Sequence, residues 1–272
     1  MQHFFLAPES LGMAVPRGVE YVGIDIQEWV YSAGRRDWVQ NVVMDLMEAS
    51  PRQVWTTIQQ EVRKRRGAHV RVRLGLLAMS PCCKTFSKAD SSNVGRGHNY
   101  RNHKDPTRPP KDQVSDKGRE AVAADAMVQK GIRVARWCAR VLGTVFYLEN
   151  PVGSLARRPY MGEWVKMTEG WEMPVRRREV HYCAYAHMYH KPTHIWTNLF
   201  WQPKGETGTG KCDRKCWCGE RGTSGKWVHR FKIAQGSHQA AGGLGRKARK
   251  NMLPRALHLE LLEAAGVLVR WD

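Results

Sequence analysis

The first 150 residues alternate between short β-branched runs and longer segments with helical periodicity. This pattern predicts strands at 19–26, 74–79 and 144–148, with helices between them from 51 to about 66 and from about 116 to 142. The first helix begins with a capping box and a proline, and the second ends at a glycine, so both carry ordinary helix-terminus signals. Strands that alternate with helices in this way predict an α/β fold with a parallel, doubly wound sheet.

The three predicted strands end on side chains that can carry chemistry. The ends are Asp25, Ser80-Pro81-Cys82-Cys83 and Glu149-Asn150. Because ligands bind at the carboxyl ends of parallel strands, we expect an acid, a cysteine pair and a second acid at one edge of the sheet. A thiolate adds to an electron-poor carbon, and a carboxyl group can protonate a ring nitrogen, so this set predicts nucleophilic attack on a ring. The alternative is a buried free cysteine beside a loop acid.

The charge of the chain is strongly positive and unevenly distributed. The 44 Lys and Arg residues exceed the 25 Asp and Glu residues, which gives a formal net charge of +19. Residues 202–250 contain twelve basic and three acidic residues, interleaved with Trp217, Trp227 and Phe231, and the polar stretch 84–114 contains seven basic residues. Basic groups track phosphates and aromatic rings stack on bases, so nucleic acid is the expected partner. A basic face kept for solubility is the alternative.

The sequence shows no membrane-directing signal. No run approaches 18 apolar residues, and residues 1–10 lack the basic start and apolar stretch of a signal peptide. The seven cysteines are an odd number, which fits a reducing compartment with free, metal-bound or catalytic thiols. We therefore expect an intracellular protein with no membrane partner.

Three cysteines and a histidine gather in the basic, Gly-rich part of the chain. Cys212, Cys216 and Cys218 lie close together, and His229 follows eleven residues after the last of them. Zinc binds four such ligands in a tetrahedron, and a small segment without a core gains folding free energy from it. These four residues are the expected ligands, with Cys183 as a further candidate. The spacing is not that of a standard zinc finger, and three exposed thiols are the alternative.

Two motifs resemble those of the cytosine-5 DNA methyltransferase family. Residues 80–87, SPCCKTFS, are similar to the family's nucleophile motif, Ser-Pro-Pro-Cys followed by x-x-Phe-Ser, and residues 146–153, FYLENPVG, resemble its Glu-Asn motif. Counted back from the Phe-Ser pair, the resemblance implies Cys83 as the nucleophile, with Cys82 in the place of the usual proline. It implies that Glu149, with Asn150 beside it, holds the target cytosine.

Further segments extend the resemblance to about residues 19–265. Residues 182–185 and 191–198 resemble a segment of phage, viral and some eukaryotic members, in which the residue at His190 is commonly Arg. The resemblance implies a Rossmann-like class I S-adenosylmethionine-dependent methyltransferase fold with a small Cys-rich basic insertion. We expect a catalytic domain at 1–200, a target-recognition or zinc-binding insertion at 201–250, and a C-terminal helix and strand at 251–272 that return to the catalytic domain.

The expected cofactor is S-adenosylmethionine, and its predicted contacts are unevenly represented. Asp25 resembles the acid that binds the cofactor ribose, Asp45 resembles the residue beside the adenine, and Phe5 and Ser80 complete the expected set. Residues 5–12 lack the glycines of the family's Phe-x-Gly-x-Gly turn, and no convincing C-terminal Gly-Asn motif is found. A bulkier turn displaces a ligand, so we expect weakened cofactor binding.

The resemblance therefore predicts an enzyme that flips a cytosine out of DNA, attacks it through Cys83 and transfers a methyl group to it. We expect a monomer that acts on DNA, with RNA as an open alternative, in the nucleus or in the cytoplasm of a phage or virus host. Two other functions stay open: a catalytically inactive DNA-binding descendant, and a zinc-dependent nucleic-acid-binding protein on an α/β scaffold.

Overall fold

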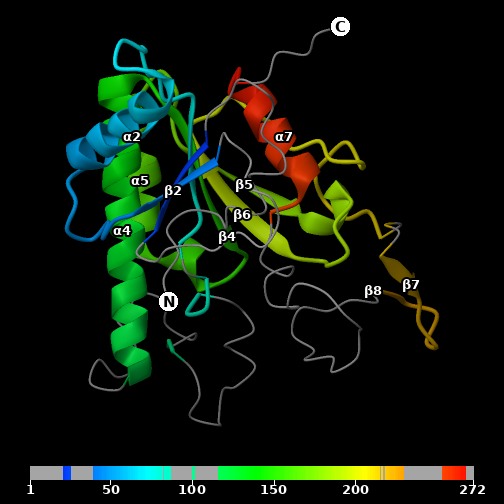
Figure 1. Cartoon of the computed structure of the whole chain (residues 1–272). Coiled ribbons are helices and arrows are strands. Elements are labelled where there is room, and N and C mark those ends of the chain that lie inside the picture. Colours follow the sequence, from blue (N-terminus) through cyan, green and yellow to red (C-terminus); the bar gives the residue numbers. More distant parts are fainter. Residues whose placement is uncertain are drawn as a thin grey trace, which may run out of the picture.

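The computed structural model of the chain shows an α/β protein in which helices cover a central sheet (Figure 1). Two parallel strands, β1 (Tyr21–Asp25) and β2 (Val39–Val43), form one sheet, and four strands form a larger one. The residues that the structure describes are 21–25, 39–81, 83–86, 100–101, 116–214, 216, 218–229 and 253–267.

The four-stranded sheet contains the candidate active site. Its strand order is β3 (Leu76–Met79), β4 (Val145–Pro151), β6 (Pro192–Thr197) and β5 (Arg176–His181). β3 and β4 are parallel, whereas β6 is antiparallel to both of its neighbours. The predicted parallel pairing is therefore confirmed for β3–β4. β1 instead pairs with β2, a strand that the sequence did not predict, in a separate two-stranded sheet, so among the described residues Asp25 does not share a sheet edge with Ser80 and Glu149. The sheet as a whole is mixed, because the later strands β5 and β6 pair antiparallel.

The two helices predicted in the first 150 residues are confirmed. α2 (Pro51–Arg66) begins at the capping box, in which the Ser50 side chain accepts from the Gln53 backbone N–H and the Gln53 side chain accepts from the Ser50 backbone N–H. α4 (Asp116–Leu142) is followed by Gly143, whose φ of 65° lies in the left-handed region that glycine adopts without strain. β4 extends further than predicted, so Glu149 and Asn150 lie within the strand.

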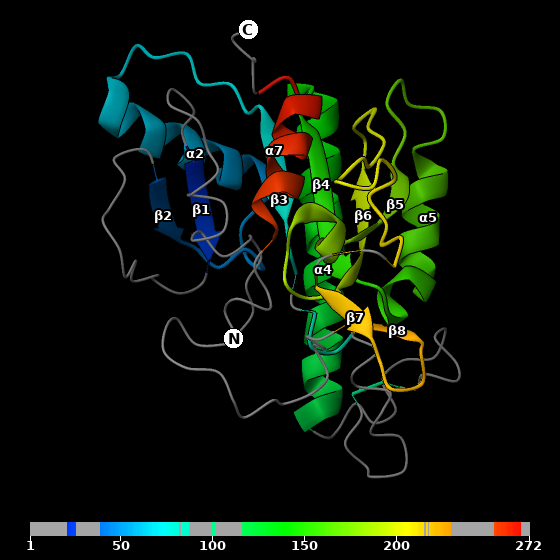
Figure 2. The same ribbon diagram turned by 90° about the vertical axis from the view of Figure 1, so that its right-hand side faces the viewer.

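Helices cover both faces of the larger sheet (Figure 1, Figure 2). α4 and α5 (Pro159–Met167) pack on one face, and α7 (Arg255–Ala264) packs on the other. Successive residues of β4 face opposite layers: Phe146 and Leu148 join the core under α4 and α5, and Tyr147 joins the core under α7. Because both faces are covered, β4 is buried from Phe146 to Asn150.

Shorter elements complete the described chain. The 3-10 helices η1 (Ser154–Arg157) and η2 (Tyr182–Tyr185) follow β4 and β5, and the strands β7 (Gly219–Arg221) and β8 (Trp227–His229) form an antiparallel hairpin. The predicted last helix is confirmed as α7, whereas the strand predicted at 267–271 lies almost entirely outside the described residues. Among the helices that the structure describes, none is long and apolar enough to cross a membrane.

Candidate active site and metal centre

The carboxyl ends of β3 and β4 bring Ser80 and Glu149 together. Met79 pairs with Leu148 in the parallel register, so the residues that follow them are neighbours. Ser80 Oγ donates a hydrogen bond to Glu149 Oε2 at 2.8 Å, although the two residues are 69 positions apart in the sequence. Glu149 is only 2% exposed. The predicted acid therefore lies, largely shielded from water, against the segment that carries the predicted nucleophile.

Asn150 connects the same two segments a second time. Its Nδ2 donates to the Pro81 carbonyl oxygen at 3.3 Å, two residues before Cys83. Asn150 is fully buried, and its Oδ1 has no hydrogen-bond partner within the described part of the chain. A buried acceptor without a donor costs about 1–3 kcal/mol, so this oxygen is an unsatisfied polar group beside the candidate site.

Cys83 begins a short turn that a buried arginine holds in place. The backbone N–H of Phe86 donates to the Cys83 carbonyl oxygen at 3.1 Å and closes the turn. Arg101 donates from Nε to the Thr85 carbonyl oxygen at 2.9 Å, and its guanidinium lies 4.1 Å from the centre of the Phe86 ring. The Cys83 side chain is half-buried, so part of it is accessible to a substrate. Cys82, the other cysteine of the predicted pair, lies outside the described residues.

Two residues to which the sequence assigned no role complete the surroundings of Glu149. Tyr182 Oη donates to Glu149 Oε1 at 2.8 Å, and Lys191 Nζ donates to the same oxygen at 3.4 Å. Burial, and after it the charge of Glu149, holds the pKa of Tyr182 well above its ordinary value, so its hydroxyl stays a donor. In the sequence, the only signal for Tyr182 and Lys191 is that they lie in the segments 182–185 and 191–198, which resemble the family.

The residues predicted to bind S-adenosylmethionine are described only in part. Asp25 is the last residue of β1, and its pairing with β2 is all that the structure describes of it; Phe5 lies outside the described residues. Asp45 is exposed just after β2. Its Oδ1 accepts from the Met47 backbone N–H at 2.8 Å, and its Oδ2 has no hydrogen bond to any described residue. Ser80 is half-buried and donates its hydroxyl to Glu149. An exposed carboxylate past the end of a parallel strand fits a hydroxyl or amine donor of an adenosyl group.

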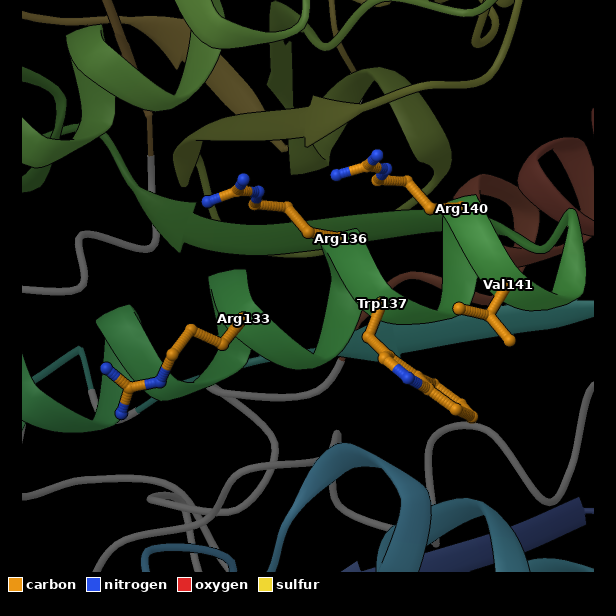
Figure 3. Close-up of a pocket in the computed structure, with 5 residues that line it drawn as sticks. All are labelled: Arg133, Arg136, Trp137, Arg140 and Val141. Atoms are coloured by element: carbon orange, nitrogen blue, oxygen red, sulfur yellow. The ribbon is translucent and has the colours of Figure 1, made fainter.

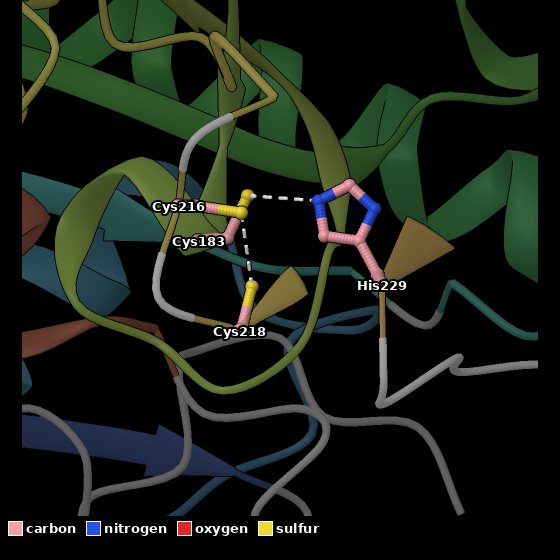
Figure 4. Close-up of side chains that lie close together, drawn as sticks. All are labelled: Cys183, Cys216, Cys218 and His229. Atoms are coloured by element: carbon pink, nitrogen blue, oxygen red, sulfur yellow. Dashed lines mark hydrogen bonds between the residues drawn. The ribbon is translucent and has the colours of Figure 1, made fainter. Parts of the chain in front are cut away.

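A second cluster of chemically active side chains lies at the end of β8. The sulfur atoms of Cys183, Cys216 and Cys218 and a ring nitrogen of His229 all lie within 4.8 Å of one another and are turned toward one another (Figure 4). Cys216 Sγ is 3.3 Å from Cys218 Sγ, and Cys183 Sγ is 3.9 Å from His229 Nε2. Sulfur atoms on one tetrahedral zinc ion lie about 3.8 Å apart, so these separations suit a single ion.

The predicted ligand Cys212 lies at the edge of this cluster. Its Sγ is 3.5 Å from Cys216 Sγ and 3.3 Å from His229 Nε2. The cluster therefore offers five ligands where zinc takes four, and the group within 4.8 Å contains Cys183 in the place of Cys212. Burial raises the pKa of the thiols of Cys183, Cys212 and Cys216, and the neighbouring thiols raise that of Cys183 further. A bound cation would stabilise the thiolates and reverse this shift.

A basic surface lies on α4, away from both clusters. Three arginines, a tryptophan and a valine line a cavity of about 400 Å³ there: Arg133, Arg136, Arg140, Trp137 and Val141. Figure 3 shows Arg136 and Arg140 on the same side of the helix and Trp137 on the opposite side. Because α4 leads almost directly into β4, this half of the helix lies near the amino end of β4, whereas Glu149 lies near its carboxyl end. The arginines are therefore not part of the candidate active site.

Comparison with known proteins links the chain to a viral protein. The chain is 29% identical over 191 residues to the probable DNA (cytosine-5)-methyltransferase of Frog virus 3 (isolate Goorha), and the match covers 68% of this chain and 72% of the viral protein. No family model matches the chain. The predicted resemblance to cytosine-5 DNA methyltransferases is thereby confirmed as a distant similarity.

Proposed function

We propose that the chain is a DNA (cytosine-5)-methyltransferase in which Cys83 is the nucleophile and Glu149 is the acid that faces the cytosine ring. The observation that carries this proposal is the position of Glu149, which Ser80 and Tyr182 hold beside the segment of Cys83. The distant similarity to the viral protein supports the same reaction class.

The proposed reaction begins with a bond between Cys83 and the base. The Cys83 thiolate adds to carbon 6 of a flipped cytosine, and the electron pair of the 5,6 double bond moves to carbon 5. Glu149 protonates or hydrogen-bonds ring nitrogen 3 and so stabilises the charge that the ring takes up. Asn150, the next residue of β4, ties this strand to the Cys83 segment through its hydrogen bond to Pro81.

S-adenosylmethionine, when bound, supplies the methyl group that carbon 5 takes up, and S-adenosylhomocysteine is released. Loss of the carbon-5 proton to water and expulsion of the Cys83 thiolate then restore the 5,6 double bond. The overall products are 5-methylcytosine, S-adenosylhomocysteine and one proton, and Cys83 is regenerated. Asp25, Asp45, Phe5 and Ser80 are the residues that we propose to hold the cofactor.

DNA is the proposed substrate because the basic insertion, 202–250, contains twelve basic and three acidic residues and presents exposed cations. Its described exposed basic residues are Lys204, Lys211, Arg214, Arg221 and Lys226. Such groups neutralise phosphates and release counterions, which is the main source of sequence-independent affinity.

We further propose that the insertion binds zinc through three cysteines and a histidine. Cys183, Cys216, Cys218 and His229 are the set whose ligand atoms converge, and Cys212 is the alternative fourth ligand. The short β7–β8 hairpin has few buried residues of its own, so a metal would supply much of the folding free energy of this segment.

Covalent trapping on a 5-fluorocytosine duplex tests the reaction. With S-adenosylmethionine present, the wild type and Cys82→Ala should form a stable protein–DNA adduct, because fluorine at carbon 5 cannot leave as a proton does. Cys83→Ala should form none. Cys82→Ala is the matched control, since it removes the adjacent thiol and leaves the proposed nucleophile. Adducts from Cys83→Ala but not from Cys82→Ala would reverse the assignment.

Calorimetry with S-adenosylmethionine separates the enzyme from an inactive descendant. A folded protein that binds no cofactor at millimolar concentration would be a DNA-binding protein without this activity. Binding without methyl transfer to cytosine in DNA or RNA would contradict the proposed reaction but not the proposed cofactor site.

A further inference from the structure

The segment that connects β5 to β6 touches Glu149 at both of its ends. It begins with Tyr182, which donates to Glu149 Oε1 at 2.8 Å, and it ends with Lys191, whose Nζ lies 3.4 Å from the same oxygen. Both residues are buried. The position of the Glu149 carboxylate therefore depends on how this segment, 182–191, is held.

The same two ends also touch the Cys–His cluster. Cys183, next to Tyr182, supplies the sulfur that lies 3.9 Å from His229 Nε2. His190, next to Lys191, stacks on the His229 ring with ring centres 4.1 Å apart and planes 5° apart. Each Glu149 contact is therefore one residue away from a contact with the cluster.

The backbone of the segment is closed on itself, so its two ends move together. The Tyr182 backbone N–H donates to the Lys191 carbonyl oxygen at 3.2 Å, and the His187 backbone N–H donates to the Tyr182 carbonyl oxygen at 3.2 Å. Ala186, where η2 ends, has a φ of 58°, a left-handed conformation that the surrounding contacts must maintain. A displacement of Cys183 is thus passed on to Tyr182.

The cluster is fixed to β5 by a third contact. The Cys212 backbone N–H donates to His181 Nδ1 at 3.1 Å, and His190 Nε2 lies 3.3 Å from the same nitrogen. Three sulfur atoms and an imidazole that converge in this way suit one tetrahedral ion, whereas without an ion they make only weak thiol contacts.

We propose that a zinc ion in the Cys–His cluster fixes the 182–191 segment, so that zinc occupancy sets the orientation of Glu149. The consequence for cytosine chemistry rests on the proposed function, whereas the link between the metal and the segment does not. Tyr182 acts here as a positioning residue, since it reaches the ring only through Glu149. Zinc then has two effects, one on the DNA-binding insertion and one on the active site.

The test uses the 272-residue chain and substitutes a metal-binding cysteine that lies outside the 182–191 segment. Cys216→Ser removes a cluster sulfur without changing any residue of 182–191, and Cys138→Ser is the matched control, because Cys138 is a buried free cysteine of α4. Metal content, hydrogen exchange of 182–191 and the trapping rate at saturating 5-fluorocytosine duplex are measured for each protein.

We expect about one zinc per chain in the wild type and in Cys138→Ser, and roughly a tenth of that in Cys216→Ser, because Cys212 is not among the ligand atoms that all lie within 4.8 Å of one another and does not restore a converging set of four. In Cys216→Ser, amide exchange in 182–191 should become at least about tenfold faster, and trapping about tenfold slower, because Glu149 loses a fixed hydrogen bond. Tyr182→Phe should keep its zinc and show the same slower trapping. If Cys216→Ser does not fold, chelation of the wild type followed by addition of zinc replaces it in the comparison.

Several results would overturn the proposal. A wild type without zinc would remove its premise. Loss of zinc with unchanged exchange in 182–191 would show that the cluster stabilises only the insertion. Faster exchange with unchanged trapping at saturating DNA would show that Glu149 does not depend on the segment. A wild type that binds zinc but never forms an adduct would contradict the proposed function, and the exchange measurement would still decide the link between metal and segment.

Discussion

Asp125 and Glu149 are both buried acids, but their surroundings differ in kind. Asp125 lies between two arginines: Arg101 Nη1 donates to its Oδ2 at 2.6 Å, and Arg158 Nη2 donates to the same oxygen at 3.1 Å. Tyr160 Oη donates to Oδ1 at 2.6 Å. Both the charge and the lone pairs of Asp125 are therefore satisfied.

Glu149 has one cation, and its shortest contacts are neutral. The hydroxyls of Ser80 and Tyr182 donate at 2.8 Å each, while Lys191 is more distant at 3.4 Å. Two guanidinium groups bind Asp125 directly, whereas the two shortest contacts of Glu149 come from the neutral hydroxyl groups of Ser80 and Tyr182. The first arrangement suits a structural role, and the second suits an acid that shares a proton with a substrate.

Removal of the Asp125 carboxylate should have the largest effect on stability. Asp125→Ala removes the carboxylate that pairs with the buried Arg101 and the half-buried Arg158, and breaking a buried ion pair in this way costs about 3–5 kcal/mol of unfolding free energy. Urea denaturation measures it. Glu120→Ala is the control, because its ion pair with Lys84 is on the surface and is worth at most about 1 kcal/mol. Equal losses in both variants would remove the distinction drawn for Asp125.

Substitution of Glu149 should affect the rate instead. Glu149→Gln keeps the size of the side chain but removes the acid, so methyl transfer to DNA should fall by about 10²–10⁴-fold, the usual contribution of a general acid. Transfer of labelled methyl groups measures the rate, and circular dichroism checks the fold. The exposed Glu163→Gln variant, on α5, should match the wild type. A Glu149→Gln enzyme within threefold of wild-type activity would contradict the role proposed for Glu149.

His258 provides a third buried titratable group, and no ion pair joins it to another residue that the structure describes. His258 Nδ1 lies 3.3 Å from Tyr147 Oη, and burial lowers the pKa of His258 from 6.5 to about 4. Above pH 6.5 the imidazole is neutral in both the folded and the unfolded chain. Between pH 6.5 and 4 only the unfolded chain takes up the proton, so the unfolding free energy should fall by about 3 kcal/mol across this range.

His258→Gln should remove that part of the pH dependence, because glutamine keeps hydrogen-bonding capacity but does not titrate. Denaturation of the variant and of the wild type at pH 7 and pH 4 gives the difference. Because both proteins contain the same other histidines, their contribution to the pH dependence of stability cancels in the comparison. An identical loss of stability in both would show that His258 is not the buried neutral group described above.

The sequence predicted those parts of the fold whose signals are local. A capping box and a regular apolar stripe are complete within one segment, so α2 and α4 were predicted within one or two residues. β5 was missed because its sequence, RRREVH, is mostly polar and Val180 is its one buried residue. It is a strand only because it pairs with β6 at the edge of the sheet. The antiparallel pairing that makes the sheet mixed was missed for the same reason.

The candidate site, too, was predicted only where its residues carry a local sequence signal. Glu149 and Cys83 lie at strand ends, where a sequence pattern can place them. Tyr182 and Lys191 reach Glu149 only through the fold of a connecting segment, for which no periodicity exists. Cys183 lies 29 residues before Cys212, so its place in the metal cluster follows from tertiary structure and not from spacing.

The central position of β4 also determines when the site can form during synthesis. β4 pairs with β3, which is about 70 residues earlier, and with β6, which is about 45 residues later. Pairings between strands this distant form slowly, because a long loop must close before any contact offsets its entropy. A nascent chain that has not yet exposed residue 197 lacks one neighbour of the strand that carries Glu149. In such incomplete chains Glu149 would not yet be held in place. The Cys83 thiol would therefore be present well before the acid that acts with it.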